Sequence, residues 1–198
     1  VVMPGTSRGF LKPEIKEQIG IDYEVEVIAV ASHDTASAAS VVPLSAEGEK
    51  VAFLSSGTWS LLGVMSDEPI LTEEARLAGF TNEGGTDGKI CFLQNITGLW
   101  ILQKLMQEWK EEGKDVAYST LLPAAEVAET DALIDVDDTV FQCPVSMAEA
   151  ITNYCIAHQQ TSPSTQGEFV KCVLRSLALR YKTGMEALNR LLPEPVTK

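Results

Sequence analysis

Two short apolar runs, each followed directly by a polar turn, dominate the pattern in the first third of the chain. Residues 28–31 read Ile-Ala-Val-Ala before Ser-His-Asp-Thr, and residues 51–54 read Val-Ala-Phe-Leu before Ser-Ser-Gly-Thr. Apolar runs of this length between turn residues are typical of buried strands. We therefore expect a strand over residues 24–31 with a buried second half. We also expect a hairpin with strands over residues 51–55 and 59–66 around a turn at 56–58.

Other segments carry the spacing and capping residues of helices. Pro13 and Gly20 mark the start and the end of a short helix. Ser146 and Thr165 each precede a glutamate by three residues, which is the capping-box pattern of a helix start. The pattern predicts helices over residues 12–20, 35–42, 71–79, 97–113, 115–129 with an interruption at Pro123, 146–158 and 165–192, and strands over 80–84 and 89–95.

Two of these helices are amphipathic, and their apolar faces define much of the expected core. Trp59 and Trp100 are also expected in the core rather than at a ligand. The helix over residues 97–113 should bury Leu99, Leu102, Leu105, Met106 and Trp109, and the long last helix should bury Phe169, Val173, Leu177, Tyr181 and Leu188.

The bulk composition narrows the class of protein. The chain has 198 residues, of which 45% are hydrophobic, so it can form an ordinary domain or a small pair. A net charge of −13 argues against a nucleic-acid or anionic-membrane partner. No apolar run approaches the roughly 20 residues that span a bilayer, and the chain does not open with a signal-peptide pattern. We therefore expect a cytoplasmic protein.

The four cysteines and one acidic segment bear on metals and disulfides. No two cysteines form a C-x-x-C pair, so no zinc site is expected. Free thiols are the default; if two cysteines do bond, we expect Cys155 and Cys172, on helices joined by a short loop. The acidic segment 131–138 lacks the glycine and the final glutamate of an EF-hand, so we predict no metal site there. The cysteines are Cys91, Cys143, Cys155 and Cys172.

The two polar turns carry the candidate chemistry. A carboxylate at the end of a rigid strand, such as Asp34, suits a general base. The turn with Gly57 and Thr58 offers hydroxyls and backbone N–H groups to a phosphate. A base and a phosphate cradle together indicate phosphoryl transfer to a hydroxyl. A hydrolase triad is disfavoured, because His33 and Asp34 are neighbours on an extended chain and point to opposite faces, and no G-x-S-x-G motif is present.

The same residues carry a family resemblance. The chain reads HDTASA at residues 33–38 and SSGTWS at 55–60, and further segments read TNEGG at 81–85, NITGLW at 95–100 and SLALRY at 176–181. In this combination, along essentially the whole chain, the sequence resembles the FGGY family of carbohydrate kinases, and within it the rhamnulokinases. Either of the first two motifs alone would be weak.

The resemblance implies an α/β fold: the actin-like ATPase or RNase H-like domain of a sugar kinase, here incomplete. Residues 1–45 would be the end of the N-terminal domain, carrying the catalytic aspartate. Residues 46–198 would be part of the C-terminal, ATP-binding domain, truncated before the adenosine motif. A fragment lacking half of the cleft is expected to have no kinase activity alone.

The resemblance also assigns roles to individual residues. Asp34 would take the proton from the attacking sugar hydroxyl, and Gly57 and Thr58 would bind the γ-phosphate of ATP. Gln103 would lie near ATP, whereas His33, Thr35 and Asn95 would contact the sugar. Each residue has a structural alternative: a helix cap for Asp34, an ordinary hairpin turn for Gly57 and Thr58, a packed histidine for His33, a first-turn helix residue for Thr35, a turn or cap for Asn95, and a solvated helix position for Gln103.

The activity implied by the resemblance is transfer of a phosphoryl group from ATP, with Mg²⁺, to L-rhamnulose, giving L-rhamnulose 1-phosphate. The partner would be this small-molecule substrate, with neither nucleic acid nor membrane involved, and the oligomeric state is open. Two alternatives remain: another ketose such as L-fuculose or L-xylulose, or a non-catalytic actin-fold ATP-binding module.

Overall fold

The computed structural model describes residues 2–31, 34–39, 41 and 50–198. The chain divides into two compact units. Unit 1 comprises residues 1–53, 63–94 and 193–198, and unit 2 comprises residues 54–62 and 95–192. The predicted domain boundary, between residues 45 and 46, lies outside the described residues and stays a prediction.

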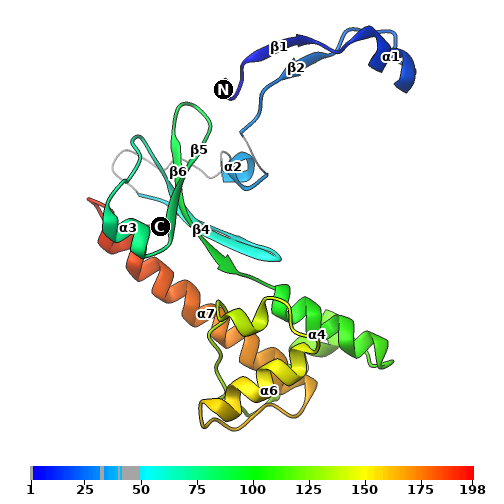
Figure 1. Ribbon diagram of the computed structural model, residues 1–198, viewed down its shortest axis with the longest axis vertical. Coiled ribbons are helices and arrows are strands. Elements are labelled where there is room, and N and C mark those ends of the chain that lie inside the picture. Colours follow the sequence, from blue (N-terminus) through cyan, green and yellow to red (C-terminus); the bar gives the residue numbers. More distant parts are fainter. Residues whose placement is uncertain (1, 32–33, 40, 42–49) are drawn as a thin grey trace. The chain divides into compact units, whose positions relative to one another are not determined.

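Unit 1 begins with a two-stranded ribbon whose strands are connected by a short helix at one end (Figure 1). Strand β1 (Ser7–Phe10) pairs antiparallel with β2 (Glu26–Ile28), and α1 (Pro13–Ile19) connects them. Helix α1 starts at Pro13 and ends at Gly20, whose φ of 71° gives the left-handed cap that glycine adopts without strain. The sequence pattern predicted both ends of this helix correctly.

The burial predicted for the strand over residues 24–31 is wrong. The strand is confined to β2, all three of its residues are exposed, and Val30 is 74% exposed. Within the apolar run only Ala31 is buried, and it leads into α2 (Asp34–Ala39), where Thr35, Ala36 and Ala39 are buried. The pattern of an apolar run identifies a strand but not the surface that covers it, and β2 pairs only with the exposed β1.

A four-stranded sheet follows, and it confirms the predicted hairpin and both later strands. Strands β3 (Ala52–Ser56), β4 (Trp59–Ser66), β5 (Phe80–Gly84) and β6 (Ile90–Thr97) lie in the order β3-β4-β6-β5. Strands β5 and β6 are antiparallel, with Phe80 opposite Gln94, and the rings of Phe80 and Phe92 stack at 4.9 Å. Helix α3 (Glu73–Leu77) precedes β5, and the Thr72 hydroxyl caps it by accepting the Ala75 N–H.

Unit 2 is largely helical and holds a well-buried core. Its helices are α4 (Trp100–Glu111), α5 (Tyr118–Val127), the 3₁₀ turn η1 (Thr139–Phe141), α6 (Met147–Ala157) and α7 (Gln166–Leu191). Helices α4 and α5 both pack against α7, and α4 also packs against α6 (Figure 1). Thr165 and Glu168 form the predicted capping box at the start of α7, with both reciprocal hydrogen bonds present. The core includes Ile96, Ile101, Leu105, Phe141, Met147, Ile151, Val173 and Leu177.

Two helix predictions needed correction. Helix α5 is not interrupted at Pro123 but continues through it from Tyr118 to Val127. A proline inside a helix loses one backbone hydrogen bond, and here the packing of α5 against α7 holds the helix together. The two helices approach closely at Gly167, where an added Cβ would lie 2.5 Å from the Ala124 carbonyl oxygen. In α4, Ile101 is buried while Leu99 and Met106 are only partly buried, so the buried face is rotated from the predicted one.

The cysteines are free thiols, including Cys155 and Cys172, the pair that the sequence favoured for any bond. Burial, with a contribution from the neighbouring Cys155, raises the pKa of the Cys172 thiol to about 12. Burial likewise raises the pKa of Cys91 to about 11. These thiols therefore behave as small core residues at neutral pH.

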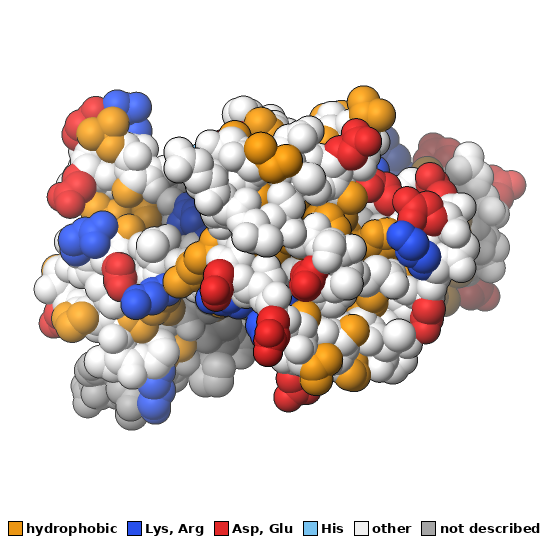
Figure 2. Space-filling model, turned by 90° about the horizontal axis from the view of Figure 1, so that it is seen from below, with side chains coloured by type: hydrophobic (Ala, Val, Ile, Leu, Met, Phe, Trp, Pro, Cys, Tyr) orange, Lys and Arg blue, Asp and Glu red, His pale blue; other side chains and the backbone are white. Residues whose placement is uncertain are grey.

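The surface mixes charged and apolar side chains. On the face that Figure 2 shows, acidic, basic and apolar groups are interspersed, so the net charge of −13 is not gathered in one patch there. No helix in the described part of the chain is both long and apolar enough to cross a bilayer. The 26-residue α7 illustrates this, because charged residues recur along it.

Candidate functional site

The tip of the β3–β4 hairpin is fastened to the start of α4. The N–H groups of Gly98 and Trp100 donate to the Thr58 carbonyl at 3.1 and 3.2 Å, and the Leu99 N–H donates to the Gly57 carbonyl at 2.8 Å. The first N–H groups of a helix lack acceptors within the helix, and Leu99 offers no side-chain cap. The carbonyls of the hairpin turn therefore cap α4 and fix the position of Thr58.

Gly98 makes this close contact possible. A Cβ added there would lie 2.4 Å from the Gly57 carbonyl oxygen and 2.7 Å from the Ser60 hydroxyl. Real Cβ atoms do not approach backbone oxygens so closely, so only glycine fits without displacing the hairpin tip. The amide of Gly57 is itself occupied, because it donates to the Trp59 carbonyl at 3.0 Å. Thr58 is exposed, so of these two turn residues it is the Thr58 hydroxyl that can reach a phosphate.

The structure brings together two of the residues that the sequence predicted for ATP. The Thr58 hydroxyl donates to the side-chain oxygen of Gln103 at 3.1 Å, and both residues are exposed. Gln103 lies one helical turn inside α4, so it faces the turn that caps the helix. Because a hydroxyl can rotate and both groups reach solvent, the pair can exchange its mutual hydrogen bond for bonds to a ligand.

A network of hydroxyl groups around the buried Ser60 adjoins the same hairpin. The Tyr181 hydroxyl on α7 is 2.7 Å from the Ser60 hydroxyl and 3.5 Å from the Ser56 hydroxyl. Ser60 is fully buried, so its hydroxyl needs a partner within the protein. The sequence pattern did not predict this contact. A tyrosine on the predicted buried face of a helix could have indicated it, since a buried phenol usually finds a hydrogen-bond partner.

The sugar-side residues are less completely placed. Asn95 is an exposed residue of β6 in unit 2. Asp34 opens α2 in unit 1, where its carboxylate accepts the Thr35 N–H at 2.7 Å, and Thr35 itself is buried. Because a helix cap accepts the N–H group two or three residues further on, this contact with the next residue decides neither for the capping alternative nor for the role of base. His33 lies outside the described residues. Asp34 and Thr58 belong to different units, so the expectation that they act together in one site stays a prediction.

An aromatic cavity of about 400 Å³ adjoins Thr58 in unit 2. The prediction that both tryptophans lie in the core is wrong for Trp59, which is 61% exposed on this cavity. Trp100 is partly buried; its indole N–H donates to the Phe141 carbonyl at 3.2 Å, and the Lys104 ammonium lies 4.8 Å from its ring centre. The cavity is lined by Thr58, Trp59, Thr97, Trp100 and Gln142.

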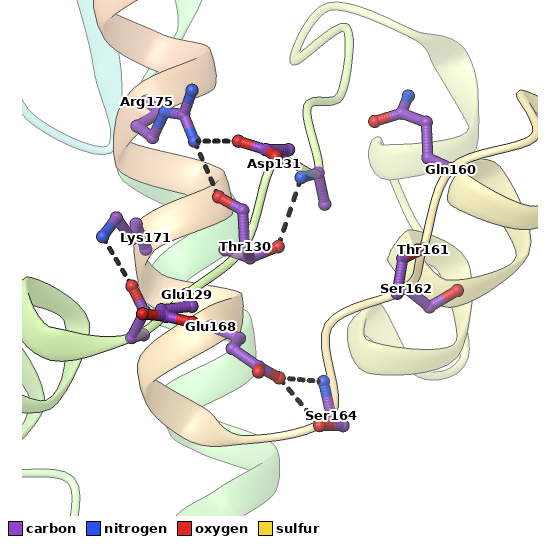
Figure 3. A pocket seen from close by; sticks show the side chains of 12 residues that line it. Glu129, Thr130, Asp131, Gln160, Thr161, Ser162, Ser164, Glu168, Lys171 and Arg175 are labelled. Carbon is purple, nitrogen blue, oxygen red and sulfur yellow. Dashed lines mark hydrogen bonds and ion pairs between the residues drawn. The ribbon is translucent and has the colours of Figure 1, made fainter.

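A larger cavity of about 700 Å³ lies beside the first half of α7 (Figure 3). Its polar groups already bind one another. Lys171 donates to the Ala128 carbonyl at 2.6 Å, Arg175 donates to the Thr130 carbonyl at 2.7 Å, and Glu168 accepts from Ser164. Because these cations hold the chain that follows α5, we interpret this cavity as structural. The sequence did not predict it, since its lining comes from segments far apart in the chain.

Comparison with known proteins identifies the family of the chain. Residues 52–197 match the C-terminal domain of the FGGY family of carbohydrate kinases. The rhamnulokinase of Bacteroides thetaiotaomicron is 42% identical over 98% of this chain and 39% of its own length, and that of Oceanobacillus iheyensis is 38% identical over 95% and 38%. This chain thus spans about two fifths of the length of the curated relatives that it matches.

A solved structure supports the fold independently of sequence. The xylulose kinase from Rhodospirillum rubrum matches 98% of this chain and 38% of its own chain, with a TM-score of 0.62 at 14% identity. That likeness confirms the predicted α/β fold of an actin-like sugar-kinase domain. Together with the family match over residues 52–197, it leads to one conclusion: the chain belongs to the FGGY family of carbohydrate kinases.

Proposed function

We propose that this chain supplies the catalytic base and part of the ATP site of a kinase that converts L-rhamnulose to L-rhamnulose 1-phosphate. The observation that carries the proposal is the Thr58–Gln103 pair, held at an exposed hairpin tip by the start of α4. Family membership adds support, and so do relatives that are 38–42% identical and carry the name rhamnulokinase.

The proposed reaction is an in-line transfer of the γ-phosphoryl group. The sugar hydroxyl oxygen attacks the γ-phosphorus, its proton passes to the Asp34 carboxylate, and ADP leaves. Thr58 and Gln103 hydrogen-bond the phosphate tail, Gly57 lets the tail approach the backbone, and His33, Thr35 and Asn95 orient the sugar. The protein contributes mainly placement and charge stabilisation, because the transferred group needs little covalent assistance.

Mg²⁺ fits the proposal as a companion of the nucleotide. Among the residues that the structure describes, no group of three or more His, Cys, Asp or Glu side chains could hold a metal ion. Mg²⁺ in kinases is bound largely by phosphate oxygens and water with only one or two carboxylates, so such a cage is not required. When bound there, the ion would neutralise charge on the phosphate oxygens.

The decisive test is Asp34→Asn in the whole gene product, assayed for L-rhamnulose phosphorylation and for ATP binding. General bases contribute about 10²- to 10⁴-fold, so we expect kcat to fall by that range while the Kd for ATP stays within twofold. Asp22→Asn, at another exposed aspartate of unit 1, is the matched control and should leave both values unchanged. A kcat within tenfold of the unmodified enzyme would refute the base role.

The sugar is tested separately. A panel of L-rhamnulose, L-fuculose and L-xylulose should give the highest kcat/KM with L-rhamnulose. Preference for another ketose would support the proposed kinase activity but assign it a different substrate. Nucleotide binding without phosphorylation of any sugar would favour the non-catalytic ATP-binding alternative. The 198-residue chain alone is expected to phosphorylate none of these sugars.

A further inference from the structure

The segment SLALRY, residues 176–181 of α7, is one of the family-like motifs that the proposed reaction does not use. Its polar side chains bond segments far away in the sequence. The Ser176 hydroxyl accepts the Ile134 N–H at 3.0 Å, and Arg180 donates to the Asp137 carboxylate at 2.6 Å. The same carboxylate accepts the Thr97 N–H at 2.8 Å. Thr97 directly precedes Gly98, the glycine that contacts the hairpin tip. Through these bonds α7 holds segments that precede α4 and that follow it in the sequence.

Tyr181 acts on the hairpin directly. Its hydroxyl bonds Ser60 at 2.7 Å and lies 3.5 Å from the Ser56 hydroxyl. Ser56 is two residues before Thr58 and Ser60 is two residues after it, so a single phenol contacts both arms of the turn. On the same turn, Gly98 packs against the Ser60 hydroxyl and the Gly57 carbonyl. The turn is therefore held between the start of α4 and the middle of α7.

We propose that Tyr181 is a positioning residue for nucleotide binding, acting through Ser60 on Thr58. The inference rests on the proposed function, in which Thr58 binds the γ-phosphate of ATP. Tyr181 has no part in contacting ATP; it fixes the backbone whose tip presents the Thr58 hydroxyl. A displacement of about 1 Å in a phosphate-binding group can cost up to about 100-fold in rate, so a support of this kind has a measurable role.

The test is Tyr181→Phe in the whole gene product, a change that removes one oxygen and keeps the ring. Loss of the bond leaves the buried Ser60 hydroxyl without this partner. We expect the KM for ATP to rise about five- to tenfold while the KM for the sugar stays within twofold. Hydrogen exchange should also speed up at the amides of residues 54–62. Ser60→Ala should give the same changes, and the double variant should be no worse than either single variant.

Tyr154→Phe is the matched control. Tyr154 is a partly buried tyrosine of α6 whose hydroxyl accepts the Asp135 N–H at 3.2 Å, so the variant also loses one hydroxyl bond within unit 2. It should lower thermal stability to a similar extent without changing the KM for ATP or exchange at residues 54–62. Equal effects of the two variants on the KM for ATP would show a general loss of stability and overturn the proposal.

Other outcomes separate this inference from the proposed function. Unchanged KM for ATP and unchanged exchange in Tyr181→Phe would overturn the positioning role, even if the protein phosphorylates L-rhamnulose. If the unmodified protein phosphorylates no sugar, the proposed function fails. In that case, weaker binding of a non-hydrolysable ATP analogue to Tyr181→Phe, but not to Tyr154→Phe, would still support the positioning role. An unmodified protein that binds no analogue would refute both proposals.

Discussion

The ribbon at the start of unit 1 and the helical part of unit 2 use apolar residues in opposite ways. In the ribbon, no residue of β1, α1 or β2 is buried. In unit 2, every helix from α4 to α7 buries part of its apolar face in one core. The exposed apolar side chains of the ribbon region are Val2, Met3, Phe10, Ile15, Ile19, Tyr23, Val27, Ile28 and Val30.

The contrast separates what local chemistry can do from what packing adds. The ribbon is shaped by short-range features: Pro13 and Gly20 bound its helix, and a backbone ladder joins its strands. Unit 2 has such features as well, but long-range contacts decide its details. A segment without a buried core opens at low free-energy cost, so we expect the ribbon to open independently of unit 2. The predicted place of residues 1–45 in a preceding kinase domain would give its apolar side chains a partner.

The largest expected difference comes from truncating one phenylalanine in each region. Phe141 is 1% exposed in the unit 2 core, whereas Phe10 is 63% exposed on β1. Phe141→Ala should lower the free energy of unfolding by about 3–5 kcal/mol, because it removes buried surface and leaves a cavity. Phe10→Ala should change it by less than about 0.5 kcal/mol. Denaturant unfolding followed by far-UV circular dichroism measures both, and equal losses would contradict the comparison.

Two glycines give the next largest difference. Gly167 lies where α7 meets α5, and an added Cβ would be 2.5 Å from the Ala124 carbonyl oxygen. Gly167→Ala should therefore lower the free energy of unfolding by about 1–3 kcal/mol, because the cost of overpacking exceeds the gain in helix propensity. At Gly20 there is open space but φ is 71°, so Gly20→Ala should cost about 1–2 kcal/mol of local strain at the end of α1.

The readouts for the two glycine variants differ. Gly167→Ala should lower the midpoint of the global transition, whereas Gly20→Ala should speed hydrogen exchange around α1 and leave that midpoint in place. A global destabilisation by Gly20→Ala would mean that the ribbon unfolds together with the core.

The sequence predicted features that depend on neighbouring residues. The hairpin around Gly57, the ends of α1 and the capping of α7 at Thr165 all follow from it, because turns and caps have local signatures. Thr58 and Gln103, which the family resemblance assigned to ATP, hydrogen-bond one another, and their role at ATP stays a prediction. The placement of Asp34 against that pair is a long-range property and stays a prediction.

The features that the sequence missed all depend on contacts between distant segments. Val30 and Trp59 belong to apolar stretches, yet both are exposed, because a pattern cannot name the surface that would cover them. Pro123 predicts a break, but packing of α5 against α7 keeps the helix continuous. The pattern assigns Tyr181 only to a core face, and its hydroxyl bond to Ser60 joins residues 121 positions apart. No local rule contains such a contact.

A smaller effect should appear in the acid range, at the start of α7. The backbone N–H and then the hydroxyl of Ser164, followed by the Thr165 N–H, hold the pKa of Glu168 below its usual range. A lowered folded-state pKa adds stability above the unfolded-state pKa of about 4.3, and that stability is lost as the pH falls through the folded-state pKa. Unit 2 should therefore lose stability as the pH falls below about 4.3.

Glu168→Gln tests this assignment. The variant should be less stable than the unmodified protein at pH 7, and the difference should shrink toward pH 3, because the carboxylate becomes progressively protonated as the pH falls. Glu186→Gln, at an exposed position of the same helix, should show no such convergence. Thermal unfolding from pH 3 to pH 7 measures both, and a difference that is constant with pH would contradict the role given to the carboxylate.

The smallest expected effect is in the ribbon, where the Lys16 ammonium pairs with the Glu24 carboxylate at 2.7 Å. Glu24 is mostly exposed, so the pair should contribute only about 0.2–1 kcal/mol. Glu24→Gln should therefore speed exchange of the Leu11 and Ile21 amides, which bond within the ribbon, by about two- to fivefold. The global midpoint should not move, and Glu17→Gln on α1 should change neither measurement. If Glu24→Gln instead lowered the midpoint, this exposed ion pair would be coupled to a cooperative core. The ribbon would then have to be treated as part of a packed unit, and the contrast with the helices of unit 2 would be lost.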